Sequence, residues 1–562
     1  MPHDPLPPAP PAPPAAGPGW RLWVVAALLF AGIASWVYEP ALRGPLVSDD
    51  LIVLVDRPWM EELTLQNVVE IIDPRGEPVL ATANWAPVHL LVHLVQRPFF
   101  GPYHLNTYPY HLTNVMVHGI NSALLAALLF AHGVPLAAAL LGGALFLLHP
   151  ANVEAVAWIF QLKTLLAFTF GCAALLCLVR RPGLSTLLFA LAILAKPSAG
   201  AVLAAAIVFE WLRQPAPGAP RRTRWLYAWG GLLALYGAVE FAAFRGAGEF
   251  LDPTPLSERV LGIVSVVGRY FVMATTSHGL SVFHQPGPTR SVLDPYFLLG
   301  LVTLLGMAFV CVRALWRRHP AAGWLGLAVA SYAPVAQIFA FRFPLADRYL
   351  YFVIAGLLGA LLVSLAPQLR SLLEALLRLR FAAPPRAWVA AAVVLVLLIG
   401  YGVRAHARAS VWGSGERVER DAIANYPEGV SGQIDRARRA VAAGDADAAI
   451  QAIEALIELG SDNPMAYLTD PSLQPLRGNP RYEALLKRIA RNWLAHYEQL
   501  PNKAPGFGVV DAVLYYIMLG ELDKADRLLD EAMLAPGAVP PQTLDSLKES
   551  VRRERAALEV PG

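Results

Sequence analysis

Charged residues are scarce in this chain of 562 residues. Asp, Glu, Lys and Arg together make up 15% of it, and hydrophobic residues make up 56%. Soluble globular domains carry about 25% charged residues, so this composition excludes an ordinary soluble protein. Positive and negative charges almost cancel, and the net charge of +3 predicts no nucleic-acid partner.

Cysteine is also scarce. The chain has only three, and all of them fall inside apolar runs: Cys172, Cys177 and Cys311. So few cysteines in such surroundings exclude a disulfide framework and a cysteine metal site. We expect them to be small apolar side chains in the membrane domain.

Long apolar runs are what the chain has in abundance. Many are roughly 17 to 25 residues long, the length that crosses a ~30 Å hydrocarbon core. We therefore predict an all-α membrane domain over 20–405, which follows a Pro/Ala-rich segment at 1–19 that we expect to be disordered. The run at 22–38 is predicted to be a retained first helix, because no signal-peptide cleavage site follows it. The other predicted spans are 109–131, 134–148, 164–179, 184–195, 197–212, 225–244, 296–312, 322–340, 349–366 and 387–404.

Basic residues gather in four segments between these runs, at 180–181, 213–224, 313–318 and 370–386. The positive-inside rule places all four in the cytoplasm. That placement requires 184–212 to be a hairpin turning at Lys196, and 259–277, which contains Arg269, not to cross. We predict about eleven crossings of a bacterial inner membrane. The loop at 39–108 and the C-terminal end are then periplasmic.

The C-terminal part, 406–562, has a different composition, with charged residues and alanines at helical spacing. Two stretches, 434–460 and 509–533, each have the pattern of a helix, a glycine turn and a second helix. This pattern is typical of tetratricopeptide-like repeats. A plain helical domain without repeats is the alternative.

Polar residues from five separate loops fall on the predicted periplasmic face. Ionisable residues near membrane depth are costly to bury and mark candidate functional sites. The candidates are Asp49 and Asp50 as catalytic acids, and His149, Glu154, Lys163, Lys196, Arg348 and Tyr349 as binding residues. A carboxylate acts as general base toward a hydroxyl, while lysine and arginine neutralise a departing phosphate. Aromatic faces hold a sugar ring.

Each candidate also has a simpler interpretation. The two acids suit a solvated loop, His149 suits a helix cap before Pro150, and the two lysines suit snorkelling to lipid headgroups. Arg348 suits an ion pair with Asp347 or a lipid phosphate. Adjacent acids also leave a divalent cation open as a cofactor, although few other ligands are evident.

Three motifs resemble those of a known family. The pattern W-x-P at 85–87 precedes Y-H-L-x-N-x-x-x-H-x-x-N at 110–121, H-P-x-x-V-E-A-V-A-W-I lies at 149–159, and A-D-R-Y-L-Y lies at 346–351. With the double acid and the helical tail, they resemble the transmembrane and tetratricopeptide-repeat-containing O-mannosyltransferases and their bacterial relatives.

The resemblance implies a GT-C fold and a polyprenyl-phosphate-linked sugar donor, with a protein of the periplasm or cell surface as acceptor. It also implies that a first-loop acid, Asp49 or Asp50, is the base, and that His149, Glu154 and Arg348 line the cavity. Lys163 and Lys196 stand in sequence contexts that differ from the family pattern, so the sugar stays open.

The function predicted from the sequence is therefore inverting transfer of a sugar to a hydroxyl of a protein. A transporter of lipid-linked sugars is one alternative, but it would favour charges at mid-membrane and an internal repeat among the helices. A non-catalytic scaffold that presents the C-terminal domain is the other.

Overall fold

The computed structural model describes residues 18–55, 57–214, 221–244, 255–337, 345–379, 385–460, 464–499, 508–534 and 541–559. Within these ranges every regular element is a helix and none is a strand, so the all-α prediction is confirmed. Most of the Pro/Ala-rich segment predicted to be disordered, namely residues 1–17, lies outside the described residues.

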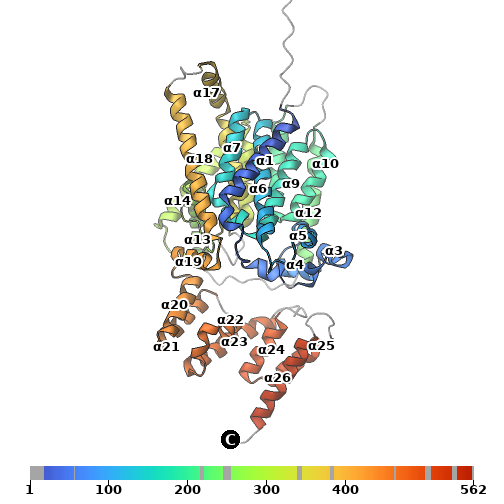
Figure 1. Cartoon of the computed structure of the whole chain (residues 1–562), viewed down its shortest axis with the longest axis vertical. Helices are drawn as coiled ribbons and strands as arrows, with labels where there is room; N and C mark the ends of the chain where they lie inside the picture. The colour runs from blue at the N-terminus through green and yellow to red at the C-terminus, as the bar shows by residue number, and fades with distance from the viewer. Residues whose placement is uncertain are drawn as a thin grey trace, which may run out of the picture.

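The upper body in Figure 1 is a bundle of long apolar helices. Eight helices in the described part of the chain are long and apolar enough to cross a membrane, as expected of a multi-pass membrane protein. They are α1 (Trp20–Val37), α6 (Tyr108–Ala131), α12 (Thr223–Phe244), α13 (Leu256–Thr276), α14 (Pro295–Trp316), α18 (Pro385–Val411), and the spans Ile159–Cys177 and Asp347–Ser364, which contain α9 (Leu162–Cys177) and α16 (Leu350–Ser364).

A ninth span results if α7 (Leu136–Leu148) and residues 150–157 are counted as one bent span. Helix α13, which the charge distribution predicts not to cross, has the length and hydropathy of a span. The number of about eleven membrane crossings therefore stays a prediction.

The predicted hairpin at 184–212 is present as α10 (Pro182–Ala195) and α11 (Ala201–Leu212). Arg222 contacts residues at both ends of this hairpin, just before α10 and near the end of α11. Its guanidinium donates to the carbonyl of Val179 at 2.7 Å, and its backbone N–H donates to Glu210 Oε1 at 2.7 Å. The start of α10 and the end of α11 therefore lie at one end of the bundle, and the chain turns at Lys196 at the other.

The basic segments gather at the end of the bundle away from the C-terminal domain. The Arg318 guanidinium lies 5.2 Å from the ring of Trp211, and Arg222 contacts Val179. Helix α17 (Ala366–Leu379) lies at this end too, whereas first-loop helices α3 (Leu65–Ile72), α4 (Glu77–Thr82) and α5 (Pro87–Phe100) lie at the other (Figure 1). The described parts of the basic segments thus lie apart from the first loop and the tail, and their placement on opposite sides of a membrane stays a prediction.

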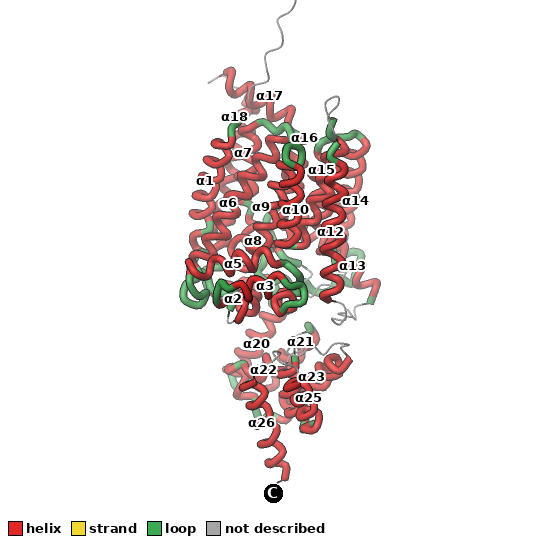
Figure 2. Tube along the Cα trace, turned by 90° about the vertical axis from the view of Figure 1, so that its right-hand side faces the viewer, coloured by secondary structure: helices red, strands yellow, loops and turns green. Residues whose placement is uncertain are grey.

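The C-terminal domain lies below the bundle in both views (Figures 1 and 2). Helix α18 continues to Val411, past the predicted boundary at 405, and α19 (Gly415–Asn425) comes next. The two predicted helical hairpins are α20 (Val430–Ala442) with α21 (Ala446–Glu458), and α24 (Val509–Leu519) with α25 (Leu522–Leu534).

Glycines make both turns of these hairpins. Gly444 has φ +78° and Gly520 has φ +74°, left-handed conformations that favour glycine. The remaining tail helices are α22 (Pro464–Thr469), α23 (Pro480–Gln499) and α26 (Pro541–Glu559). The helical architecture of the tail is observed, and its assignment to tetratricopeptide repeats stays a prediction.

Candidate functional site

The H-P motif breaks a helix inside the bundle. Helix α7 ends at Leu148, and the chain bends by 55° before it forms the short helix α8 (Val153–Ala157). Pro150 has no backbone N–H to donate, so α7 cannot continue through it. Every residue from 149 to 168 is buried. The motif is therefore an irregular segment in the interior of the membrane domain.

Polar side chains of α6 hydrogen-bond to the carbonyls of this irregular segment. Asn114 Nδ2 donates to the carbonyl of Trp158 at 2.8 Å and lies 3.3 Å from that of Ile159. Asn121 Nδ2 donates to the carbonyl of Leu165, at the start of α9, at 3.0 Å. Irregular backbone at membrane depth requires such partners, because lipid supplies none. In the sequence alone these asparagines stand out only through the family resemblance. Their spacing, with polar residues at 111, 114, 118 and 121 on one helical face, could have identified this role.

Asp50 anchors the first loop to the same segment. Its Oδ1 accepts the backbone N–H of Phe160 at 2.9 Å, and its Oδ2 accepts that of Val47 at 3.0 Å. Trp158 Nε1 also donates to the carbonyl of Val47 at 3.0 Å. Burial raises the pKa of Asp50 to about 8, although the two backbone donors oppose the shift. Asp50 is 1% exposed and holds the loop in place.

Asp49, the neighbouring acid, has a different environment. It is partly exposed, and its Oδ1 lies 3.4 Å from the Ser48 hydroxyl. Its carboxylate is close enough to Lys163 and Arg348 to interact with both charges. Of the two predicted catalytic acids, Asp49 therefore has the more accessible carboxylate, and it lies within charge–charge range of Lys163 and Arg348.

Arg348 pairs with Glu154, which lies 194 positions earlier in the chain. Its backbone N–H donates to Glu154 Oε2 at 2.6 Å, and its guanidinium hydrogen-bonds to Oε1. The guanidinium also lies 5.1 Å from the ring of Trp158 and 5.0 Å from that of Tyr349. The simpler expectation that Arg348 pairs with Asp347 is wrong, because the Asp347 carboxylate contacts a histidine instead.

The two membrane-domain lysines lie beside this pair. Lys196 Nζ donates to Thr164 Oγ1 at 2.8 Å, and the ammonium is close enough to Lys163, Arg348 and Glu154 to interact with all three. Lys163 Nζ lies 4.0 Å from the centre of the Phe160 ring. Among the described residues it has no hydrogen-bond acceptor.

Lysine usage is a further signal for this site in the sequence, and it is absent from the predictions above. The chain has only six lysines, and the first 486 residues contain only the two that meet here. All other basic residues in that part are arginine or histidine. The site thus brings together three cations, Lys163, Lys196 and Arg348, with the carboxylates of Asp49 and Glu154. Cations outnumber these two carboxylates, which suits an anionic ligand such as a phosphate.

His149 makes its contacts outside this cluster of charged side chains. Its Nδ1 accepts the backbone N–H of Ala151 at 3.2 Å, its Nε2 lies 3.0 Å from the carbonyl of Ala274 in α13, and its ring packs against Tyr401 of α18 at 4.9 Å. Both ring nitrogens are engaged. The geometry is that of a helix cap, and these contacts tie the broken segment to α13 and α18.

A divalent cation finds no evident set of ligands. Among the described residues, no group of three or more His, Cys, Asp or Glu side chains is arranged to hold a metal ion. Backbone N–H groups already occupy both oxygens of Asp50. The two adjacent acids therefore do not form a shared pair of ligands.

Fold and site together define a multi-pass α-helical membrane protein with a cation-rich polar cluster. The cluster lies at the end of the bundle that carries the C-terminal domain. The chain matches no protein-family model, no curated protein and no solved structure. The resemblance of its motifs to O-mannosyltransferases stays a prediction.

Proposed function

We propose that this protein is a membrane glycosyltransferase of the GT-C type. It resides in a bacterial inner membrane, with its site and C-terminal domain in the periplasm. It moves a sugar from a polyprenyl-phosphate-linked donor to a hydroxyl of a periplasmic or surface protein. The observation that carries the proposal is the partly exposed carboxylate of Asp49 beside the charges of Lys163 and Arg348.

In this reaction Asp49 is the general base. Its carboxylate takes the proton of the acceptor hydroxyl as that oxygen bonds to the anomeric carbon. The bond from the anomeric carbon to the phosphate oxygen breaks on the opposite face, so the configuration inverts. Lys163, Lys196 and Arg348 stabilise the negative charge on the departing polyprenyl phosphate. Tyr349, which is half-buried, offers an aromatic face to the sugar.

The C-terminal helical domain is proposed to bind the acceptor protein. Stacked helical hairpins form surfaces that hold extended segments. The domain lies below the end of the bundle where the polar cluster is found (Figure 2). An acceptor segment held there would have its hydroxyl near the first loop.

The test is glycan mass spectrometry of periplasmic and surface proteins from cells that lack this gene and are complemented with single variants. We expect Asp49→Asn to reach wild-type levels in the membrane but to lower transfer by about 100-fold or more, the usual effect of losing a general base. Asp50→Asn should instead lower the amount of folded protein, since an amide cannot accept both backbone N–H groups; the cost is about 1–3 kcal/mol.

Asp73→Asn is the matched control, because Asp73 is an exposed acid of the same loop. It should change neither abundance nor transfer. Full transfer by Asp49→Asn would refute the proposed base. If deleting the gene removed no sugar adduct from any protein, although wild-type protein was present in the membrane, protein O-glycosylation itself would be refuted.

A further inference from the structure

A buried chain of hydrogen bonds connects the C-terminal domain to the Arg348 turn. His284 Nε2 lies 2.6 Å from Asp347 Oδ1, and His284 Nδ1 lies 2.9 Å from the hydroxyl of Tyr426. The side chains of His284 and Asp347 are each 1% exposed. Because a carboxylate only accepts, Nε2 carries a proton and donates it, and in the neutral ring Nδ1 accepts from Tyr426. Tyr426 directly follows α19, in the C-terminal part of the chain.

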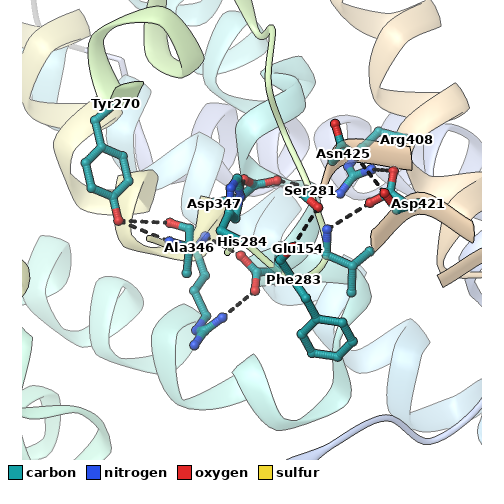
Figure 3. Close-up of polar contacts among 12 residues, drawn as sticks. Glu154, Tyr270, Ser281, Phe283, His284, Ala346, Asp347, Arg408, Asp421 and Asn425 are labelled. Atoms are coloured by element: carbon teal, nitrogen blue, oxygen red, sulfur yellow. Dashed lines mark hydrogen bonds and ion pairs between the residues drawn. The ribbon is translucent and has the colours of Figure 1, made fainter. Parts of the chain in front are cut away.

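A second connection joins α19 to the same turn, and Figure 3 shows its contact between Asp421 and Arg408. Asp421 of α19 accepts the backbone N–H of Val282 at 2.9 Å and forms an ion pair with Arg408 at the end of α18. Arg408 Nη2 also lies 3.8 Å from Asp347 Oδ2. Asp347, buried at the foot of the bundle, is thus contacted by His284 from the loop after α13 and approached by Arg408.

The turn Asp347–Tyr349 points its first two side chains to different partners. Asp347 contacts His284, and Arg348 contacts Glu154. Tyr270 holds the preceding residue, since the backbone N–H of Ala346 donates to its hydroxyl at 3.1 Å. Figure 3 shows these contacts meeting around one short segment. The position of Arg348 therefore depends on what holds Asp347.

We propose that Tyr426 and His284 are positioning residues of the polar site. Through their contact with Asp347 they set the orientation of the Arg348 guanidinium. The position of the C-terminal domain against the bundle then controls how tightly the site binds a polyprenyl phosphate. The inference deepens the proposed function and rests on it for the identity of the ligand. The C-terminal domain then has two roles, since it completes the membrane site as well as receiving the acceptor.

The physical reason lies in the burial of Asp347. A buried carboxylate that loses a hydrogen-bond donor is left unsatisfied, so the segment that carries it shifts or admits water. Among the described residues, Asp347 Oδ2 already has no hydrogen bond. Loss of the His284 contact would leave Oδ1 without its donor as well. The adjacent Arg348 would then lose its fixed position against Glu154.

The experiment uses the full-length protein in lipid nanodiscs and the variants Tyr426→Phe and His284→Gln. Tyr426→Phe removes one hydroxyl in a residue of the C-terminal part of the chain. Gln285→Ala is the matched control. Gln285 lies in the same loop and accepts the backbone N–H of Val430 at 2.5 Å, so it contacts the same domain, but it is no part of the chain to Asp347.

Two quantities are measured, together with the melting temperature of each variant. The first is hydrogen exchange of the peptide 345–350, which contains the Arg348 amide bonded to Glu154. The second is the affinity for a polyprenyl monophosphate. For Tyr426→Phe we expect faster exchange in this peptide and about five-fold weaker binding, the effect of one lost hydrogen bond, with a melting temperature lowered by no more than about 2–4 °C. Gln285→Ala should change neither quantity.

Unchanged exchange at 345–350 in both Tyr426→Phe and His284→Gln would overturn the inference. Equal effects of Gln285→Ala would also overturn it, and so would faster exchange without weaker binding. If wild-type protein bound no polyprenyl phosphate, the proposed function would fail, and exchange at 345–350 would still decide whether the C-terminal domain holds the Arg348 turn.

Discussion

At the scale of the residue, the adjacent aspartates Asp49 and Asp50 show how burial and contacts give two identical side chains different roles. Asp50 is buried and accepts two backbone N–H groups, whereas Asp49 is partly exposed beside two cations. In the sequence alone the two aspartates are equivalent candidates for the base. Only the contacts with Phe160 and Val47 assign the loop-holding role to Asp50.

The raised pKa of Asp50 predicts a pH dependence of stability. The folded state keeps a proton that the unfolded chain releases, because the pKa rises from 3.8 to about 8 on folding. The contribution of this carboxyl to the free energy of unfolding is thus full below about pH 4 and is lost as pH rises toward 8. The slope is at most about 1.4 kcal/mol per pH unit.

Thermal unfolding of the purified protein at pH 5, 6, 7 and 8 would measure this effect. Wild-type protein should lose stability over this range relative to Asp50→Asn, which cannot titrate. A difference between the two proteins that stays constant with pH would contradict the raised pKa.

At the scale of the element, α13 and α14 pack with their backbones in close approach. A Cβ added at Gly300 would lie 1.9 Å from the carbonyl oxygen of Val264, and one added at Gly268 would lie 2.1 Å from that of Tyr296. Small residues permit such approach between membrane helices. The packing of α13 against α14 matters for the site, because α13 carries Tyr270, which hydrogen-bonds to Ala346 beside the Arg348 turn.

Gly300→Ala should therefore destabilise the protein by about 1–3 kcal/mol, the usual cost of overpacking. Gly306→Ala is the matched control in the same helix, because a Cβ there meets nothing within 4 Å. It should be neutral or slightly stabilising, since alanine favours a helix over glycine. Equal melting temperatures for the two variants would show that α13 and α14 do not pack in this way.

The broken segment at the H-P motif also belongs to this scale. A continuous apolar run at 134–148 predicted a span, and α7 is indeed a helix. The path of the chain beyond Leu148 is decided by Pro150 and by His111 and Asn114 of α6, which contact the carbonyls of Ala157 and Trp158. Glu154, one of the two carboxylates of the site, thus lies on a segment that neighbouring helices hold in place.

At the scale of the whole molecule, the arrangement of charges makes a prediction about topology. The basic segments and the C-terminal domain lie at opposite ends of the bundle (Figure 1). The positive-inside rule then places the domain in the periplasm. Ser371 in α17 and Ser546 in α26 are exposed positions at the two ends.

In a variant whose three native cysteines are replaced by alanine, Ser546→Cys should react with a membrane-impermeant thiol reagent in cells with a permeabilised outer membrane. Ser371→Cys should react only after the inner membrane is opened. The reverse pattern would invert the proposed topology and remove the site from the periplasm.

The sequence by itself determined the features that depend on local physics. Apolar run length predicted the helices, the loop charges predicted the hairpin at 184–212, and the glycine turns predicted the two helical hairpins of the tail. The tertiary structure decided the pairing of distant groups. Glu154 and Arg348 are 194 positions apart, and His284 and Tyr426 are 142 apart. No periodicity encodes such pairs, because they arise from the packing of whole helices against one another.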